Sequence, residues 1–340
     1  MKILLLEFSR IGDTLMHEPT LRALKLHFPE AEIHALTDAA NFEILATHPA
    51  ITQVEIFPRK IKNLRDAWRM IQKIFQLRRS QFDLLVNFYM GGITSTLARW
   101  TAIPQRLSFD KTKALRRSYN LLAPTPSSFG NWIVEFTELV RPLGIDPQHI
   151  WPLPRFFIPD YLNTFAQKYL QPDQVYICYN LATAVAIKCW PAAEYAQLAA
   201  TLYHTKNCIP VVVTNPGQSE YVDTFFAHYP ADLPAIRLPI LSLSELAALF
   251  KHVKMLITGD TGLMHLAFAI DTPVVALFTY KRPEYAVSAT TAKMVVFRED
   301  DTQAPIIPGQ KYGCADLTQT EVLDAVKALL PICPARLAVV

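Results

Sequence analysis

The sequence lacks the features that define several classes of protein. Its five cysteines are odd in number and include no C-x-x-C pair, which argues against a disulfide framework or a zinc site. The N-terminal apolar run meets Glu7 after four residues, too few for a signal peptide or for the roughly 20 residues of a spanning helix. No low-complexity stretch occurs. We therefore expect a globular, cytoplasmic protein with no membrane span.

The chain is rich in apolar residues and unevenly charged. With 340 residues, 51% of them hydrophobic, it is long enough for two domains that each bury a full core. Residues 1–155 carry 20 lysines and arginines against 14 aspartates and glutamates, whereas residues 156–340 carry 13 against 16. The basic first half favours an anionic partner there.

Short apolar runs alternate with helical patterns along the chain. Runs with little polar alternation, such as 2–8, 175–180 and 209–213, are typical of central parallel strands, and the helices between them indicate βαβ units. Four prolines between 146 and 160 cannot continue a helix or a central strand, so they predict a linker. We expect two α/β domains, 1–155 and 156–340. Whether the last helix, 318–330, packs back on the first domain is left open.

Three loops each follow a predicted strand and lead into a predicted helix. The first, Ser9 to Asp13, contains S-x-x-G-D and precedes a helix pattern over 15–26. The second runs from Leu181 to Trp190 and ends in K-C-W-P. The third is Gly259-Asp260-Thr261-Gly262, in which Asp260 or Thr261 can cap the next helix. A helix N-terminus at the carboxyl edge of a parallel sheet favours phosphate, although the same turn also serves in crossovers that bind nothing.

In this order, the three stretches resemble the motifs of glycosyltransferase family 9, the ADP-heptose:lipopolysaccharide heptosyltransferases. The resemblance implies an α/β protein of the GT-B fold, with two Rossmann-like domains whose parallel sheets face one another across a cleft. The first domain would bind the acceptor and the second the nucleotide-sugar. Asp13 falls on the general base, a role that needs a carboxylate within hydrogen-bond reach of the acceptor hydroxyl.

The same resemblance implies a set of donor-binding residues in the second domain. Those residues are Thr183, Lys188, Glu220, Leu241, Asp260, Thr261, Gly262 and His265. Thr183 and Lys188 would hold the phosphates, and the Asp260 turn would hold the sugar and diphosphate. Glu220 would approach the ribose hydroxyls and Leu241 would form a wall of the adenine pocket. For His265, a bond to a sugar hydroxyl and a bracing role stay open.

Cations of the first half are the candidates for acceptor binding. Arg10 and His17 flank Asp13, and Arg59 and Lys60 begin a predicted helix over 59–79. The apolar stripe of that helix is Ile61, Leu64, Trp68, Ile71 and Phe75, and its other face carries Lys62, Arg65, Arg69, Lys73, Arg78 and Arg79. Two interpretations stay open: a core helix with a solvated basic face, or contact with an anionic glycolipid or an acidic bilayer surface. Five further cations over 106–117 are expected in a mobile loop.

The function predicted from this resemblance is inverting transfer of a heptose from ADP-heptose to the lipopolysaccharide inner core. No D-x-D pair follows a predicted strand, so we expect no metal and no cofactor beyond the donor substrate. The expected partners are the nucleotide-sugar and an anionic glycolipid, with peripheral contact at the inner membrane surface left open. Nucleic acid is a weaker alternative because no recognised binding motif accompanies the charge.

Three alternatives to this function remain at this point. A related transferase could use another nucleotide-sugar or a protein or polysaccharide acceptor. A GT-B-like epimerase would act on the nucleotide-sugar alone. A non-enzymatic binding protein would keep nucleotide affinity without Asp13.

Overall fold

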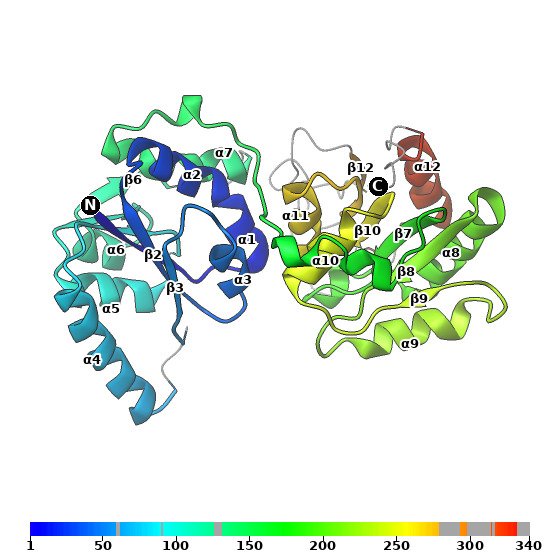
Figure 1. Ribbon diagram of the computed structural model, residues 1–340, viewed down its shortest axis with the longest axis horizontal. Helices are drawn as coiled ribbons and strands as arrows, with labels where there is room; N and C mark the ends of the chain where they lie inside the picture. Colours follow the sequence, from blue (N-terminus) through cyan, green and yellow to red (C-terminus); the bar gives the residue numbers. More distant parts are fainter. Residues whose placement is uncertain are drawn as a thin grey trace, which may run out of the picture. The chain divides into compact units, whose positions relative to one another are not determined.

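The computed structural model describes residues 1–58, 62–89, 91–125, 131–278, 293–297, 314 and 317–331. The chain divides into two compact units, Met1–Phe157 and Ile158–Val340 (Figure 1). The division falls inside the proline-rich segment 146–160. Two predicted acceptor residues, Arg59 and Lys60, lie outside the described residues.

The first unit is a six-stranded parallel sheet with helices between its strands. The strand order is β3-β2-β1-β4-β5-β6, the order of a Rossmann-type doubly wound sheet. Its strands are β1 (Lys2–Glu7), β2 (Glu32–Thr37), β3 (Gln53–Ile56), β4 (Leu84–Asn87), β5 (Gln105–Phe109) and β6 (Leu121–Ala123). Its helices are α1 (Ile11–Met16), α2 (Glu18–His27), α3 (Phe42–Ala46), α4 (Leu64–Arg79), α5 (Gly92–Thr101), α6 (Lys113–Ser118) and α7 (Trp132–Thr137), with 3-10 turns η1 (Glu138–Leu143) and η2 (Pro147–His149).

Three sequence predictions for this unit need correction. The helix expected over 59–79 begins at Leu64, and the side chain of Asn63 caps it by accepting a hydrogen bond from the Asp66 amide. The helix expected over 15–26 begins earlier and is split into α1 and α2 at His17, because Pro19 lacks an amide hydrogen and is tolerated only in a first helical turn. The segment 106–117, expected as a mobile loop, instead forms most of β5 and α6. Thr112 caps α6 by accepting a hydrogen bond from the Leu115 amide.

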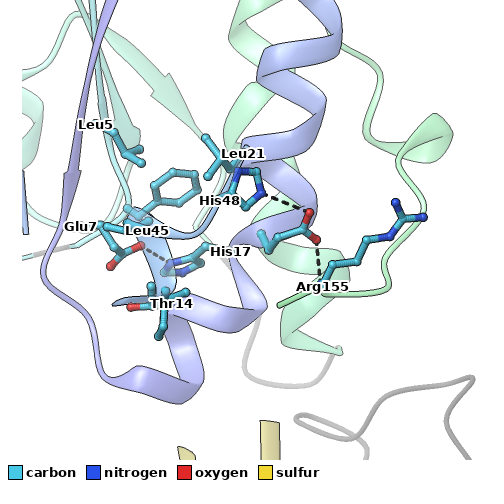
Figure 2. Close-up of a pocket in the computed structure, with 11 residues that line it drawn as sticks. Leu5, Glu7, Thr14, His17, Leu21, Leu45, His48 and Arg155 are labelled. Carbon is cyan, nitrogen blue, oxygen red and sulfur yellow. Dashed lines mark hydrogen bonds and ion pairs between the residues drawn. The ribbon is translucent and has the colours of Figure 1, made fainter. Parts of the chain in front are cut away.

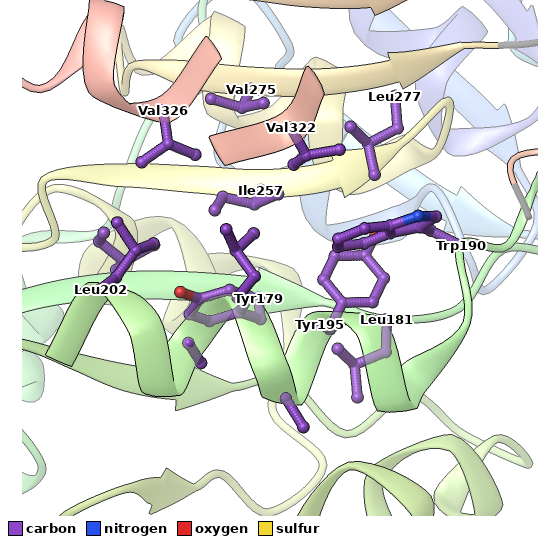
Figure 3. Packing of buried hydrophobic residues seen from close by; sticks show 14 of the residues in the cluster. Tyr179, Leu181, Trp190, Tyr195, Leu202, Ile257, Val275, Leu277, Val322 and Val326 are labelled. Carbon is purple, nitrogen blue, oxygen red and sulfur yellow. The ribbon is translucent and has the colours of Figure 1, made fainter. Parts of the chain in front are cut away.

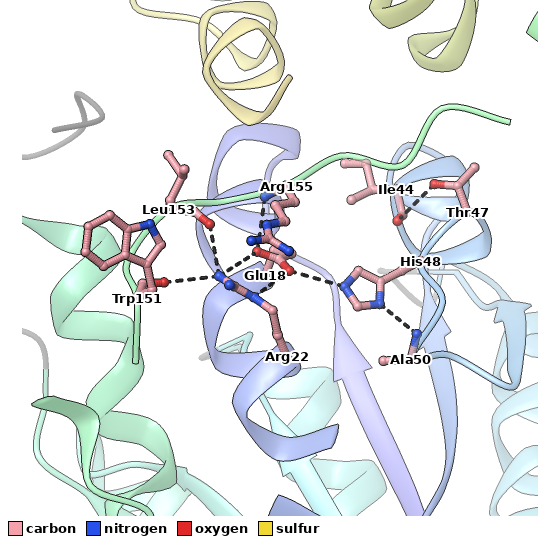
Figure 4. Close-up of polar contacts among 9 residues, drawn as sticks. All are labelled: Glu18, Arg22, Ile44, Thr47, His48, Ala50, Trp151, Leu153 and Arg155. Carbon is pink, nitrogen blue, oxygen red and sulfur yellow. Dashed lines mark hydrogen bonds and ion pairs between the residues drawn. The ribbon is translucent and has the colours of Figure 1, made fainter. Parts of the chain in front are cut away.

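The end of the first unit is tied to α2 by a buried carboxylate (Figure 4). Glu18 accepts a hydrogen bond from the Arg155 amide at 3.1 Å and lies 3.5 Å from His48 Nε2. Arg22 pairs with Glu18 and donates to the carbonyls of Trp151 (3.1 Å) and Leu153 (3.0 Å). These contacts explain why the segment up to Phe157 belongs to the first unit although its prolines exclude an α-helix or a central strand.

The second unit repeats the same topology. Its parallel strands follow the order β12-β11-β10-β7-β8-β9, which is again Rossmann-like. The strands are β7 (Val175–Asn180), β8 (Cys208–Val212), β9 (Ile236–Arg237), β10 (Met255–Gly259), β11 (Val274–Phe278) and β12 (Lys293–Phe297). The helices are α8 (Ala192–Lys206), α9 (Ser219–His228), α10 (Leu243–Phe250), α11 (Gly262–Ala269) and α12 (Gln319–Leu329), with 3-10 turns η3 (Asp160–Leu162), η4 (Phe165–Lys168) and η5 (Ala186–Lys188).

The last helix contributes to the core of the second unit. Val322 and Val326 of α12 lie with Ile257 of β10 and Tyr195 of α8 in one buried cluster (Figure 3). Trp190 is fully buried in this cluster, and its indole Nε1 donates to the backbone carbonyl of Leu317 at 2.9 Å. The apolar face of α12 is therefore used on the sheet of its own unit.

Along the described part of the chain, none of the helices combines the length and the apolar composition required to cross a bilayer.

Candidate active site

In each unit, predicted site residues follow the strands at which the strand order reverses. In the first sheet the chain leaves β1 on one side towards β2 and returns to β4 on the other side of β1, and Asp13 follows β1. In the second sheet the corresponding neighbours are β7 and β10, which are followed by the loop 181–190 and the turn 259–262. Open α/β sheets bind their ligands at such reversals because neighbouring loops diverge there.

Asp13 lies in the first turn of α1, three residues after the exposed Arg10. Its side chain is half-buried, and no donor to its carboxylate occurs in the part of the chain that the structure describes. The Asp13 carboxylate does not cap the helix, because Arg10 occupies the N-cap position of α1. Asp13 is therefore a carboxylate held by the helix backbone with its oxygens available.

A buried pair, Glu7 and His17, holds the turn before Asp13 (Figure 2). The Glu7 carboxylate lies 2.6 Å from His17 Nδ1 and accepts a hydrogen bond from the Ser9 amide at 2.9 Å. Burial by itself would raise the pKa of Glu7, but the adjacent His17 and the Ser9 donor lower it below its ordinary value. The imidazole stacks on Phe88 at 4.7 Å and meets Phe136 edge-on at 4.3 Å.

The predicted acceptor role of His17 does not fit this position. The imidazole is buried between two aromatic rings and paired to Glu7, so it cannot reach a ligand in solvent without leaving the core. We assign His17 to support of the turn that carries Asp13. Glu7 was missed as a functional residue, although a carboxylate that ends an apolar central strand is itself a signal of a buried polar network.

In the second unit an ion pair joins two of the predicted donor residues. Lys188 Nζ, at the end of η5, is paired with the Asp260 carboxylate in the turn after β10, and both side chains are largely buried. Gly259 permits this approach: a Cβ on it would lie 2.9 Å from the Lys188 carbonyl oxygen and 3.0 Å from Thr183 Cγ2. A side chain at 259 would therefore separate the loop 181–190 from the turn.

A network of polar side chains, which the sequence motifs did not reveal, lies at the strand ends next to this ion pair. Asn180, buried at the end of β7, donates to Thr258 Oγ1 at 2.9 Å and to Thr261 Oγ1 at 3.2 Å. Asn215, which follows β8, donates to Asn180 Oδ1 at 2.8 Å. One side chain thus ties together the ends of three strands. Its sequence signal is an asparagine that closes the otherwise apolar segment 175–180.

Of the two residues that the sequence offered as the cap of α11, Asp260 and Thr261, the N-cap is Thr261. Its Oγ1 accepts a hydrogen bond from the Met264 amide at 3.4 Å, and the same oxygen accepts a second hydrogen bond from the Asn180 side-chain amide at 3.2 Å. Gly262 is the first residue of the helix. The amides of a first helical turn have no acceptor within the helix and carry the positive end of its dipole, so they favour an anion beside Lys188.

The remaining predicted donor residues lie at different depths. Thr183 is buried, and its hydroxyl bonds the backbone of Val185. Gln218 Nε2 donates to the Thr183 carbonyl at 2.8 Å, which brings the exposed Glu220, in the first turn of α9, near the same loop. Leu241 is half-buried and packs on the small cluster that includes Phe165.

His265 occupies one turn of α11 beyond the cap. It is buried, and its ring meets Phe268 edge-on at 6.4 Å. Between the two interpretations left open by the sequence, this burial favours a bracing role.

Comparison with known proteins gives the family. The model of glycosyltransferase family 9 (heptosyltransferase) matches residues 69–311. Lipopolysaccharide heptosyltransferase 3 of Escherichia coli is 24% identical over 288 residues, which cover 78% of this chain and 80% of that protein.

Solved structures share the fold across nearly the whole chain. A family 9 glycosyltransferase from Veillonella parvula superposes with a TM-score of 0.83 at 19% identity and covers 97% of both chains. The Escherichia coli ADP-heptose LPS heptosyltransferase II superposes with a TM-score of 0.81 at 20% identity, covering 98% of this chain and 99% of that one. The prediction of two Rossmann-like domains in a GT-B fold is confirmed. The chain belongs to glycosyltransferase family 9, and it is a glycosyltransferase.

Proposed function

We propose that this enzyme transfers a heptose from ADP-heptose to a sugar hydroxyl of the lipopolysaccharide inner core, with inversion at the anomeric carbon and without a metal ion. The observation that carries the proposal is the assembly of Lys188, Asp260 and the capped N-terminus of α11 at the strand-order reversal of the second sheet. The names of the relatives, which describe heptosyltransferases acting on lipopolysaccharide, support the choice of sugar and acceptor.

In the proposed reaction the second unit stabilises the leaving group. As the bond between the anomeric carbon and the diphosphate breaks, negative charge grows on the departing ADP. The Lys188 ammonium and the amides of the first turn of α11 supply positive charge at one place, and a preorganised arrangement is worth more than mobile solvent. Asp260 holds the lysine in position. Because the lysine and the helix amides supply this positive charge, the proposed reaction needs no metal ion.

The first unit supplies the base. Asp13 would remove the proton of the acceptor hydroxyl as that oxygen attacks the anomeric carbon from the face opposite to ADP, which produces inversion. Its carboxylate has no hydrogen-bond donor among the described residues, and Glu7 with His17 fixes the backbone that carries it. The exposed Arg10 lies at the start of the same helix, where it could bind acceptor phosphate or carboxylate.

Replacement of the base separates this proposal from its alternatives. Asp13→Asn is expected to lower kcat by about 100-fold to 10,000-fold while leaving the affinity for ADP unchanged. Glu30→Gln, which removes an exposed carboxylate of the same unit, is the matched control. Transfer by Asp13→Asn at the wild-type rate would overturn the role of Asp13.

Donor and product analysis tests the rest of the proposal. Calorimetry with ADP, UDP and GDP is expected to show preference for ADP, and a preference for another nucleotide would replace the proposed donor. Incubation with ADP-heptose alone distinguishes an epimerase, which would change the sugar without any acceptor.

A further inference from the structure

The helix α4 carries two apolar faces, and only one of them serves the core. Met70 and Leu77 are buried against the first sheet, and Lys73 is buried on the same side, paired with Glu55. The apolar stripe predicted from the sequence lies elsewhere on the helix. Its members within the described residues are Leu64 (89% exposed), Trp68 (61%), Ile71 (45%) and Phe75 (53%).

The helical periodicity accounts for this separation. At about 100° per residue, the positions 64, 68, 71 and 75 fall within one narrow sector, and the centre of the buried face lies roughly on the opposite side of the helix. Figure 1 shows α4 along the outer edge of the first unit. Burial of large apolar side chains is the main favourable term of folding, so four of them in a row on a solvent-exposed sector need a different reason.

Cations border the stripe on both sides. The helix contains five lysines and arginines against one carboxylate, Asp66. By the same periodicity Arg65 and Arg79 lie on one flank of the stripe and Arg78 on the other. Long basic side chains can lay their methylene groups along apolar surface while the charge remains in the polar layer.

A neighbouring helix extends the surface. Arg78 Nε donates to the backbone carbonyl of Trp100 at 2.7 Å, which places the C-terminal end of α5 beside that of α4. Trp100 is itself 56% exposed and follows an exposed cation, Arg99. Tryptophan with arginine beside an apolar stripe is the composition of segments that lie in the interface of a bilayer.

We propose that the exposed stripe of α4, with Trp100, is a docking surface for an anionic phospholipid bilayer. The stripe would enter the boundary between headgroups and acyl chains, and Arg65, Arg78 and Arg79 would contact the negatively charged headgroups. This inference deepens the proposed function, since an acceptor anchored in a bilayer requires an enzyme that works at its surface. The experiments that test it nevertheless measure membrane binding and do not depend on the transfer reaction.

Sedimentation with vesicles tests the surface directly. The full chain is expected to bind vesicles of phosphatidylglycerol mixed with phosphatidylcholine, and to bind vesicles of phosphatidylcholine alone far less. Trp68→Ser combined with Phe75→Ser is expected to lower the partition coefficient at least about tenfold, since two interfacial anchors are removed. Leu26→Ser, at an exposed leucine of α2 (77%), is the matched control and is expected to bind as the wild type does.

The charge contribution has its own pair of variants. Arg65→Glu combined with Arg79→Glu is expected to abolish the preference for phosphatidylglycerol. Lys206→Glu combined with Lys327→Glu, at two exposed lysines of the second unit, makes the same change of net charge and is expected to retain the preference. Equal losses in both variants would show that net charge alone attracts the protein and would overturn the assignment to α4.

Two further results would overturn the proposal. One is wild-type binding by the Trp68 and Phe75 double variant. The other is that the wild-type protein is a dimer, that the double variant is a monomer, and that neither binds vesicles. The stripe would then be covered by a second copy of the chain. Both double variants of α4 are expected to keep the wild-type affinity for ADP. A failure of vesicle binding with normal ADP affinity therefore rejects only the docking surface and leaves the proposed reaction standing.

Discussion

The buried amide of Asn180 offers the sharpest test of how the second unit builds its phosphate site. Asn180→Leu keeps approximately the volume of the side chain but removes its three hydrogen bonds, to Thr258, Thr261 and Asn215. At roughly 1 kcal/mol net for each bond, the free energy of unfolding should fall by about 3 kcal/mol. For a unit of this size, that loss corresponds to a decrease in Tm of about 6–12 °C.

The same substitution should weaken nucleotide binding. Thr261 caps the helix whose first amides are proposed to meet the diphosphate, and Asn180 is one of the groups that hold its hydroxyl. Loss of one brace, about 1–2 kcal/mol, should raise the Kd for ADP by roughly 5-fold to 30-fold. Calorimetry measures the Kd and a thermal melt measures the stability.

A matched variant separates the two effects. Thr272→Val removes a fully buried hydrogen bond, from Thr272 Oγ1 to the Phe250 carbonyl at 3.0 Å, just before β11 begins and therefore away from the carboxyl edge of the sheet. It should lower the Tm and leave the Kd for ADP unchanged. If Asn180→Leu also left the Kd unchanged while lowering the Tm, the network would be structural only and the reasoning about the cap would be refuted.

Two further predictions concern stability. Glu7→Gln should weaken the decrease in stability that the protein shows as the pH is lowered. The pKa of Glu7 is lowered in the folded protein, so the ionised carboxylate stabilises the fold at pH values above the unfolded pKa of about 4.3. This contribution is lost as the pH falls through the lowered pKa. Urea midpoints from neutral pH down to about pH 3 measure this, and parallel decreases in wild type and variant would contradict it. Trp190→Phe should lower the free energy of unfolding by about 1–3 kcal/mol, because the carbonyl of Leu317 loses its buried donor. An unchanged Tm would show that this carbonyl finds another donor, such as water.

Sequence patterns predicted the central strands and most of the helices, because buried parallel strands have a distinctive apolar composition. They did not predict β5, most of which lies in a segment expected as a loop. The segments 2–7, 175–180 and 255–259 are almost entirely apolar and are buried on both faces of their sheets. The sequence also narrowed the cap of α11 to Asp260 or Thr261, since a side-chain oxygen that accepts from a backbone amide two or three residues later is a local geometry. Such features depend only on residues close together in the chain.

The role of α4 shows where the same reasoning stops. Periodicity identified a helix with an apolar stripe, and a core helix with a solvated basic face was one of the two interpretations that the sequence left open. The structure buries Met70 and Leu77 instead and leaves Trp68 and Phe75 exposed. Both faces are apolar enough to pack, and only the position of the sheet selects between them.

The sequence by itself determined the fold class, the order of the motifs and the family, because these depend on local periodicity and on short runs of residues. Tertiary structure alone decided which polar side chains meet. It paired Glu7 with His17, which removed His17 from the acceptor candidates, and it placed Asn180 beneath Thr261, 81 positions further along the chain. Contacts of that kind arise when parallel strands align their ends, and no local pattern encodes which ends become neighbours.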